Sequence, residues 1–203
     1  MKKQNYSVIL ASKSPRRREI LEGLGVSFAV VVADADESSE LCDPESLVKT
    51  LALRKGVAVR DRLCAEGQLT EDTLIIASDT VVALEHEILG KPQDEADAAR
   101  MLRALSGRSH TVYSGVALLT KDGEAVAADA TQVHFSVLSD AWIDRYIRSR
   151  EPMDKAGSYA VQGLAAAVID GISGDYFNVV GLPVRKMNVL LQDFLGIDLF
   201  DLG

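Results

Sequence analysis

Cysteine, histidine and aromatic residues are all scarce in this sequence. Its 203 residues include 2 cysteines and 3 histidines, and aromatic residues make up 5% of the chain. The cysteines, Cys42 and Cys64, form no C-x-x-C pair and stand beside no histidine at metal-ligand spacing. This pattern excludes a disulfide-rich fold, and we expect two free thiols in a reducing cytosol. Because aromatics are few, the core must be built from Val, Leu, Ile and Ala.

The sequence also lacks a long hydrophobic run. Its first apolar stretch, residues 8–11, is far shorter than a signal-peptide core or a membrane span. We therefore expect a soluble, cytoplasmic protein with no membrane partner. Positive charge is in deficit, because 22 Lys and Arg stand against 30 Asp and Glu, for a formal net charge of −8. Nucleic-acid affinity rests mainly on phosphate neutralisation, so no nucleic-acid partner is expected.

Two familiar nucleotide-binding fingerprints are missing as well. The sequence contains neither a G-x-x-x-x-G-K-[ST] loop nor a G-x-G-x-x-G turn. Its histidines, His86, His110 and His134, fall in separate segments without metal-ligand spacing, and we interpret them as structural or surface residues. Any nucleotide site in this chain must therefore be built in another way.

Patterns of hydrophobic residues indicate the fold class. Short apolar or alternating runs predict strands, and apolar residues at helical spacing predict helices. The predicted strands span residues 8–11, 28–32, 74–77, 81–84, 87–89, 111–119 and 126–138; the predicted helices span 15–24, 45–63, 94–105, 140–148 and a last segment from 183, with a hairpin near 172–175. Because βα units and hairpins both occur, we predict an α/β fold with a mixed sheet and flanking helices. The length suits a single two-lobed domain over residues 1–203.

The strongest local signal is the turn after the first predicted strand. Ser14 is placed to cap a helix that starts at Pro15. That helix opens with Arg16, Arg17 and Arg18. A helix N-terminus carries partial positive charge, so each arginine there costs a few tenths to about 1 kcal/mol. The arginines either extend into solvent as a basic turn or converge, with the helix dipole and serine hydroxyls, on an anion such as a triphosphate.

A second signal is the tripeptide Ser78-Asp79-Thr80. It follows the apolar run 74–77, which we predict to be a strand that ends there. Ligands of α/β proteins gather at the carboxyl ends of strands. Asp79 could act there as a base, as a metal ligand or as a turn cap, and the tripeptide alone leaves these alternatives open.

Three further segments carry groups suited to a nucleotide. Pro92 restricts Lys91 to an extended conformation, which suits a phosphate contact and equally a surface turn. The acidic loop around Glu37 offers hard oxygen ligands for Mg²⁺ or Mn²⁺, although a solvated charge run has the same composition. Gln162 lies in a run bracketed by glycines. Its amide can pair with the edge of a nucleobase, or the run can be a plain loop.

Together, these segments resemble the Maf family of nucleoside triphosphate pyrophosphatases. The resemblance runs from Leu10 to about Val184, and its parts come in the family's order. They are Ala11-Ser12-Lys13-Ser14-Pro15-Arg16-Arg17, Asp36-Glu37, Leu51-Ala52 with Lys55, Ser78-Asp79-Thr80-Val81-Val82, Gly90-Lys91-Pro92, Leu105-Ser106-Gly107, Asp154-Lys155-Ala156-Gly157 with Gln162-Gly163, and Val180-Gly181-Leu182-Pro183. One departure is Gly56, where the family usually has alanine, and we expect it to have little consequence.

The resemblance implies a fold and an activity. The fold would be that of the inosine triphosphate pyrophosphatases, with two lobes around a cleft. The reaction would be hydrolysis between the α and β phosphates of dTTP or UTP, which gives the nucleoside monophosphate and pyrophosphate. The implied cofactor is a divalent metal cation, Mg²⁺ or Mn²⁺, and related proteins suggest a homodimer.

The resemblance also implies roles for single residues. Asp79 matches the family's proton acceptor. Arg16, Thr80 and Gln162 match positions tied to base choice, and they carry the set of the branch that prefers dTTP and UTP. The branch acting on 7-methyl-GTP has a bulky aromatic at the first position and glutamine at the second. In such a site the triphosphate would be held by Ser12, Arg16, Arg17, Lys55 and Lys91, the base by Thr80 and Gln162, and the metal by Glu37 and Asp79.

Two other functions remain open at this point. The same reaction could act on modified or purine nucleotides, which a substrate panel would distinguish. The protein could instead be a nucleotide-sensing regulator that binds without turnover. The presence of Asp79 counts against this alternative, because a protein that only binds a nucleotide needs no base.

Overall fold

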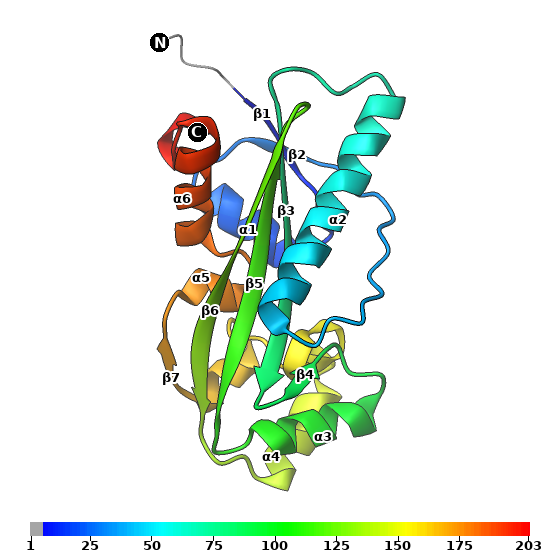
Figure 1. Cartoon of the computed structure of the whole chain (residues 1–203). Coiled ribbons are helices and arrows are strands. Elements are labelled where there is room, and N and C mark those ends of the chain that lie inside the picture. The colour runs from blue at the N-terminus through cyan, green and yellow to red at the C-terminus, as the bar shows by residue number, and fades with distance from the viewer. Residues whose placement is uncertain (1–5) are drawn as a thin grey trace. The chain divides into compact units, whose positions relative to one another are not determined.

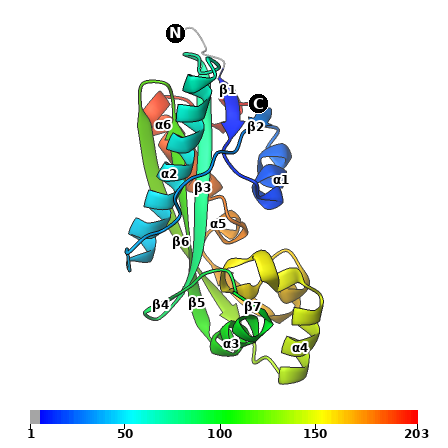
Figure 2. The ribbon, with the colours of Figure 1, turned by 90° about the vertical axis from the view of Figure 1, so that its right-hand side faces the viewer.

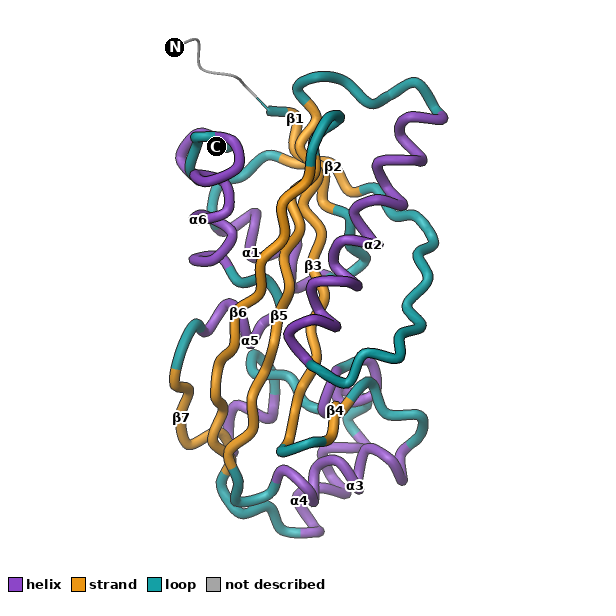
Figure 3. Tube along the Cα trace, viewed as in Figure 1, coloured by secondary structure: helices purple, strands orange, loops and turns teal. Residues whose placement is uncertain are grey.

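The computed structural model describes residues 6–203 as an α/β protein with a mixed sheet (Figures 1 and 3). Its elements in chain order are β1 (Ser7–Leu10), α1 (Pro15–Gly23), β2 (Phe28–Val30), α2 (Pro44–Ala65), β3 (Thr73–Leu84), β4 (Glu87–Leu89), α3 (Glu95–Leu105), β5 (Ser109–Leu119), β6 (Glu124–Phe135), α4 (Asp140–Arg148), β7 (Ile169–Ser173), α5 (Tyr176–Val180) and α6 (Val184–Leu195). Short 3₁₀ turns cover Glu151–Asp154, Ala156–Ser158, Leu164–Val168 and Leu199–Asp201.

The strands follow the order β2-β1-β3-β5-β6-β7, with β4 paired to β3. Strand β1 pairs in parallel with both β2 and β3, whereas β4 pairs antiparallel with β3 and β7 antiparallel with β6. This mixed sheet with flanking helices confirms the predicted fold class. Among the helices of residues 6–203, none combines the length and apolar content needed to cross a membrane.

The chain divides into two compact units. The first comprises the chain up to Asp79 together with Ser114–Asp129 and Gly181–Gly203. The second comprises Thr80–Tyr113 and Ala130–Val180. Strands β3, β5 and β6 each contribute residues to both units.

In the first unit, helices cover both faces of the sheet. Helix α2 lies along one face, and α1 and α6 lie on the other (Figures 1 and 2). The core on the α2 side is aliphatic, as expected from the scarcity of aromatics, and joins Ala52, Val59 and Leu63 to Ile75, Ala77, Ala117 and Leu119. The segment that carries Lys55 is therefore fixed by packing against the sheet.

Two glycines set how closely α2 lies to the sheet. A Cβ on Gly115 of β5 would lie 2.3 Å from the carbonyl oxygen of Val48 in α2, so only glycine allows this approach. A Cβ on Gly56 would lie 2.2 Å from Cδ1 of Leu119. Glycine replaces the family's usual alanine at position 56, and the side chain of Leu119 fills the space that the alanine methyl group would take.

The second unit is built around a core with aromatic members. Helices α3 and α4 contribute Met101, Leu102, Ile143 and Ile147, which pack with residues of β3, β4, β5 and β6. His110, Phe135 and Tyr159 meet edge to face within this core, with ring centroids 4.8 to 5.3 Å apart. The few aromatics of the chain are thus partly concentrated in one cluster.

Helix starts agree closely with the capping patterns. Asp94 and Ser139 cap α3 and α4, and their side chains accept hydrogen bonds from the amides of Asp97 and Trp142. Ser14 holds the N-cap position before Pro15, but its side chain makes no capping bond. The hydroxyl of Ser12 accepts the Ser14 amide instead, at 3.2 Å.

Two local predictions are wrong. The predicted hairpin near 172–175 is instead the end of β7 followed by α5. Asp175 begins that helix, since its carboxylate accepts the amide of Phe177 at 2.8 Å. Strand β6 ends at Phe135 rather than at the predicted residue 138, and Val137 beyond its end is 85% exposed. A short polar stretch does not show from sequence alone whether a turn returns as a strand or starts a helix.

Candidate active site

Asp79 lies in the middle of a strand, and the prediction that a strand ends at Ser78-Asp79-Thr80 is wrong. Strand β3 continues through the tripeptide to Leu84. Ser78 is fully buried, and its hydroxyl donates to the carbonyl oxygen of Gly181 at 2.9 Å. The hydroxyl of Ser78 can therefore lie in a buried strand, because Gly181, a residue distant in sequence, accepts its hydrogen bond.

Lys55 contacts both of the carboxylates to which the family resemblance assigns a metal-binding role. Its Nζ donates to Oδ1 of Asp79 at 2.6 Å and lies 3.1 Å from Oε1 of Glu37. The side chains of Lys55 and Asp79 are only 20% and 12% exposed, whereas that of Glu37 is 64% exposed. Removing one partner of a buried ion pair typically costs about 3–5 kcal/mol, so Lys55 and Asp79 depend on each other, while Glu37 is held less firmly.

Arg17 does not extend into solvent, which removes the basic-turn alternative for this residue. Its Nε donates to the carbonyl oxygen of Gly181 at 2.7 Å, and its Nη1 donates to the hydroxyl of Ser12 at 3.2 Å. Burial lowers the pKa of the Arg17 guanidinium, and the carboxylate of Asp79 opposes that shift. The start of α1 thus places one arginine and one serine in the neighbourhood of Asp79, whereas Arg16 is half-buried and Arg18 is exposed.

The side chains of this unit that could hold a divalent cation are the carboxylates of Glu37 and Asp79. The carboxylates of Glu37 and Asp79 both contact the ammonium of Lys55, so a positive charge already lies between them. No group of three or more His, Cys, Asp or Glu that could hold a metal occurs within residues 6–203. Mg²⁺ is commonly bound through one or two carboxylates, with water and substrate phosphates completing its ligands, so two carboxylates are sufficient.

In the second unit, one backbone hydrogen bond connects two of the predicted segments. The amide of Gly157 donates to the carbonyl oxygen of Gly90 at 3.0 Å, which joins the segment of Lys91 to the run 154–163. Lys91 is exposed while the following Pro92 is buried, as expected for a fixed turn with an outward lysine. Thr80 is half-buried on β3, and Gln162 is exposed.

A clamp around Gln162 was not foreseen from the sequence. Glu151 accepts hydrogen bonds from the Tyr146 hydroxyl at 2.8 Å and from the Leu164 amide at 3.1 Å. The Tyr146 oxygen in turn accepts the amide of Ala160 at 3.1 Å. Burial and the bond to Glu151 raise the pKa of Tyr146, so it stays protonated and keeps donating. The backbone on both sides of Gln162 is thereby fixed.

Gly163 belongs to the same clamp. A Cβ at this position would lie 2.1 Å from Oε1 of Glu151. The only sequence signal for this arrangement was the Gln162-Gly163 pair, because the partner carboxylate lies twelve residues earlier and has no recognisable motif.

The remaining scarce residues have no part in this chemistry. Cys42 and Cys64 are free, as predicted, and both are exposed. His110 is buried and bonds to the Tyr159 hydroxyl at 2.8 Å, and His134 lies between the hydroxyls of Ser109 and Ser173 at 2.7 and 3.1 Å. His86 is exposed in the turn between β3 and β4. The structural or surface role predicted for all three is confirmed.

Comparison with known proteins identifies the family. The family model described as Maf-like protein matches residues 7–194. A dTTP/UTP pyrophosphatase of Symbiobacterium thermophilum is 48% identical over 188 residues, which cover 92% of this chain and 93% of the relative. A dTTP/UTP pyrophosphatase of Bacillus cereus is 43% identical over 92% of this chain and 89% of its own. The chain therefore belongs to the Maf family.

Among solved structures, the Staphylococcus aureus Ham1 protein resembles this chain weakly. It has 14% sequence identity and a TM-score of 0.44, over 64% of this chain and 71% of that one.

Proposed function

We propose that this protein is a hydrolase that converts dTTP and UTP to the nucleoside monophosphate and pyrophosphate. The observation that carries the proposal is the placement of Asp79, which is paired with Lys55 and lies near Arg17, in a chain of the Maf family. The relatives named dTTP/UTP pyrophosphatase support the substrate class.

Asp79 is suited to act on water. Lys55 fixes the orientation of its carboxylate through a 2.6 Å bond, and the strand around it is buried. A positioned carboxylate can accept a hydrogen bond from water and take its proton as the oxygen attacks the α-phosphorus. The bond from the α-phosphorus to its bridging oxygen then breaks, and pyrophosphate leaves.

The cationic and hydroxyl groups would hold the triphosphate. Ser12 and Arg17 are already connected by a hydrogen bond beside the start of α1, whose free amides favour an anion. Arg16, Lys55 and Lys91 supply further positive charge in the roles that the family resemblance gives them. Thr80, Gln162 and Arg16 would select the pyrimidine base.

Glu37 and Asp79 would hold a divalent cation, Mg²⁺ or Mn²⁺. When bound, this cation supplies neutralisation of phosphate charge and lowers the pKa of water. We also propose that the protein works in the cytoplasm. We further propose that it forms a homodimer, and sedimentation of the purified protein would test its oligomeric state.

A substrate panel tests the proposed function. Purified protein is incubated with dTTP, UTP, modified pyrimidine nucleotides and purine nucleotides in the presence of Mg²⁺ or Mn²⁺. The expected result is one pyrophosphate and one dTMP or UMP for each dTTP or UTP consumed. Release of orthophosphate would overturn the proposal. Faster hydrolysis of purine or modified nucleotides would show that these are the substrates instead of dTTP and UTP. Nucleotide binding without turnover would favour a regulatory protein over an enzyme.

A further inference from the structure

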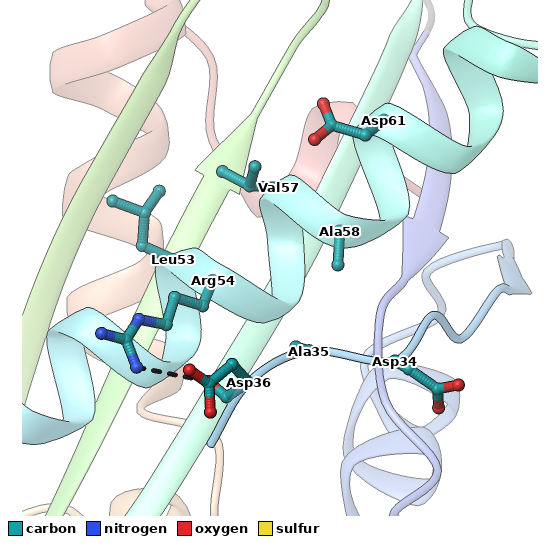
Figure 4. A pocket seen from close by; sticks show the side chains of 8 residues that line it. All are labelled: Asp34, Ala35, Asp36, Leu53, Arg54, Val57, Ala58 and Asp61. Atoms are coloured by element: carbon teal, nitrogen blue, oxygen red, sulfur yellow. Dashed lines mark hydrogen bonds between the residues drawn. The ribbon is translucent and has the colours of Figure 1, made fainter. Parts of the chain in front are cut away.

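The segment that carries Glu37 has little packing of its own. Between β2 and α2 the chain forms neither helix nor strand, and residues 36–43 are exposed. A pocket of about 460 Å³ lies between this segment and α2, lined by Asp34, Ala35 and Asp36 on one side and by Leu53, Arg54, Val57, Ala58 and Asp61 on the other (Figure 4). Because side chains do not fill the space between this segment and α2, the position of the segment depends on polar contacts.

Arg54 makes those contacts on both sides of Glu37. Its Nη1 donates to the carbonyl oxygen of Ser38 at 2.6 Å and to that of Asp36 at 3.3 Å. These are the residues directly before and after Glu37. Figure 4 shows the Arg54 side chain reaching from α2 to the backbone of this segment.

The turn held by Arg54 is itself closed. The carboxylate of Asp36 accepts the Ser38 amide at 2.9 Å and the Ser38 hydroxyl at 2.6 Å. Arg54 therefore binds a turn that is closed by its own hydrogen bonds and has Glu37 at its centre.

Glu37 needs such a support. Its side chain is 64% exposed, and its carboxylate pairs with Lys55 at 3.1 Å. Exposed ion pairs orient side chains weakly, because solvent screens them and both side chains lose rotamer freedom. Lys55 follows Arg54 in the same packed helix, so one rigid element holds both the backbone around Glu37 and the partner of its carboxylate.

We propose that Arg54 is a positioning residue that fixes Glu37 for divalent-cation binding. It touches neither substrate nor metal in this role, and it acts through the two carbonyls that flank Glu37. The inference rests on the metal role of Glu37 in the proposed function. It predicts that loss of Arg54 weakens cation binding and leaves the chemical step at Asp79 nearly unchanged.

Mn²⁺ binding tests this role without turnover. The affinity of the nucleotide-free protein for Mn²⁺ is measured by electron paramagnetic resonance for the wild type, Arg54→Ala, Arg54→Lys and Glu37→Gln. Loss of groups that orient metal ligands typically costs 10–100-fold in affinity, so Arg54→Ala is expected to weaken Mn²⁺ binding roughly tenfold. Arg54→Lys should recover part of the loss, since an ammonium can reach one carbonyl.

The matched control is Arg60→Ala. Arg60 lies on the same helix and pairs with Glu124 at 3.0 Å, away from the segment around Glu37. Its replacement should leave Mn²⁺ affinity unchanged. The double variant Arg54→Ala/Glu37→Gln should bind Mn²⁺ as weakly as Glu37→Gln alone, because Arg54 acts only through Glu37.

Kinetics separate this inference from the proposed function. If dTTP is hydrolysed, Arg54→Ala should raise the half-saturating Mg²⁺ concentration by a similar factor and leave kcat at saturating Mg²⁺ nearly unchanged. Unchanged Mn²⁺ affinity in Arg54→Ala, or additive losses in the double variant, would overturn the role of Arg54 even if dTTP is cleaved. If dTTP is not cleaved while the Mn²⁺ results hold, the proposed function fails and the role of Arg54 stands.

Discussion

At the residue scale, the site depends on polar side chains that are paired with one another. Lys55 and Asp79 form an ion pair, and the guanidinium of Arg17 donates a hydrogen bond to the hydroxyl of Ser12. Each polar group is satisfied by a partner from another element, so a single substitution changes more than one contact. This coupling makes the residue-scale predictions specific.

Replacing Asp79 with asparagine should remove the base and keep the shape. Positioned general bases contribute about 10²–10⁴-fold to rate, so kcat for dTTP should fall by roughly that factor. Asp61→Asn, a change of the same charge at an exposed position on α2, is the control and should keep full activity. Near-normal turnover in Asp79→Asn, measured as pyrophosphate release, would refute the role of Asp79.

Gly163→Ala should disturb the clamp around Gln162. The new Cβ would lie 2.1 Å from Oε1 of Glu151, so the carboxylate must move and lose its bond to the Leu164 amide or to Tyr146. We expect the variant to lose discrimination between dTTP and purine nucleotides more than it loses kcat. Gly23→Ala, where an added Cβ meets nothing within 4 Å, is the control. A substrate panel checks this, and unaltered base preference would contradict it.

At the scale of elements, the contact between α2 and the sheet governs the site. Helix α2 carries Lys55 and Arg54, and its packing on Ile75, Ala77 and Leu119 fixes their direction. Backbone approaches backbone closely at Gly115 of β5, where no side chain fits against Val48. A change at Gly115 should therefore act on the site without touching any of its residues.

Gly115→Ala should both destabilise the protein and impair hydrolysis. The added Cβ would lie 2.3 Å from a backbone oxygen, which cannot rotate away, so α2 must shift. Overpacking of this kind costs about 1–3 kcal/mol. Gly171→Ala on β7 is the control, because its Cβ would lie 3.7 Å from His134 in ordinary contact. Urea unfolding and dTTP hydrolysis are the measurements, and equal stability of the two variants would contradict the expectation.

Local sequence patterns predicted most of the helices and strands, but they did not show where Asp79 lies in its strand. Caps at Asp94 and Ser139 were predictable because a capping bond joins residues three apart. The continuation of β3 through Ser78 and Asp79 was not, because it depends on Gly181 and Lys55, which are 103 and 24 residues away in the chain. Local patterns cannot report partners at that separation.

At the scale of the whole molecule, stability should depend on pH through a buried histidine. His110 lies in the core of the second unit, with its Nε2 bonded to Tyr159 and its ring against Phe135. Burial, together with the nearby His134, lowers the pKa of His110 to about 4. The folded protein therefore resists protonation that the unfolded chain accepts below about pH 6.5.

The free energy of unfolding should fall as the pH drops from about 6.5 towards 4. In that window the unfolded chain binds a proton that the folded chain does not, so stability rises with pH by up to about 1.4 kcal/mol per pH unit. His110→Gln should show a shallower dependence, and His86→Gln, at an exposed position, should match the wild type. Urea unfolding at pH 7.5 and 5.0 measures this, and equal slopes for the wild type and His110→Gln would contradict it.

The sequence by itself determined the family, the mixed α/β fold, the helix starts and the set of residues on which the proposed chemistry rests. Those features follow from short-range spacing and from motifs in a fixed order. Only the tertiary structure decided that Lys55 links Glu37 to Asp79, that Arg17 is anchored on Gly181, that Glu151 fixes the backbone around Gln162 and that Arg54 supports Glu37. The physical reason is that buried charges and unpaired backbone groups need partners, and folding supplies those partners from segments that the sequence keeps far apart.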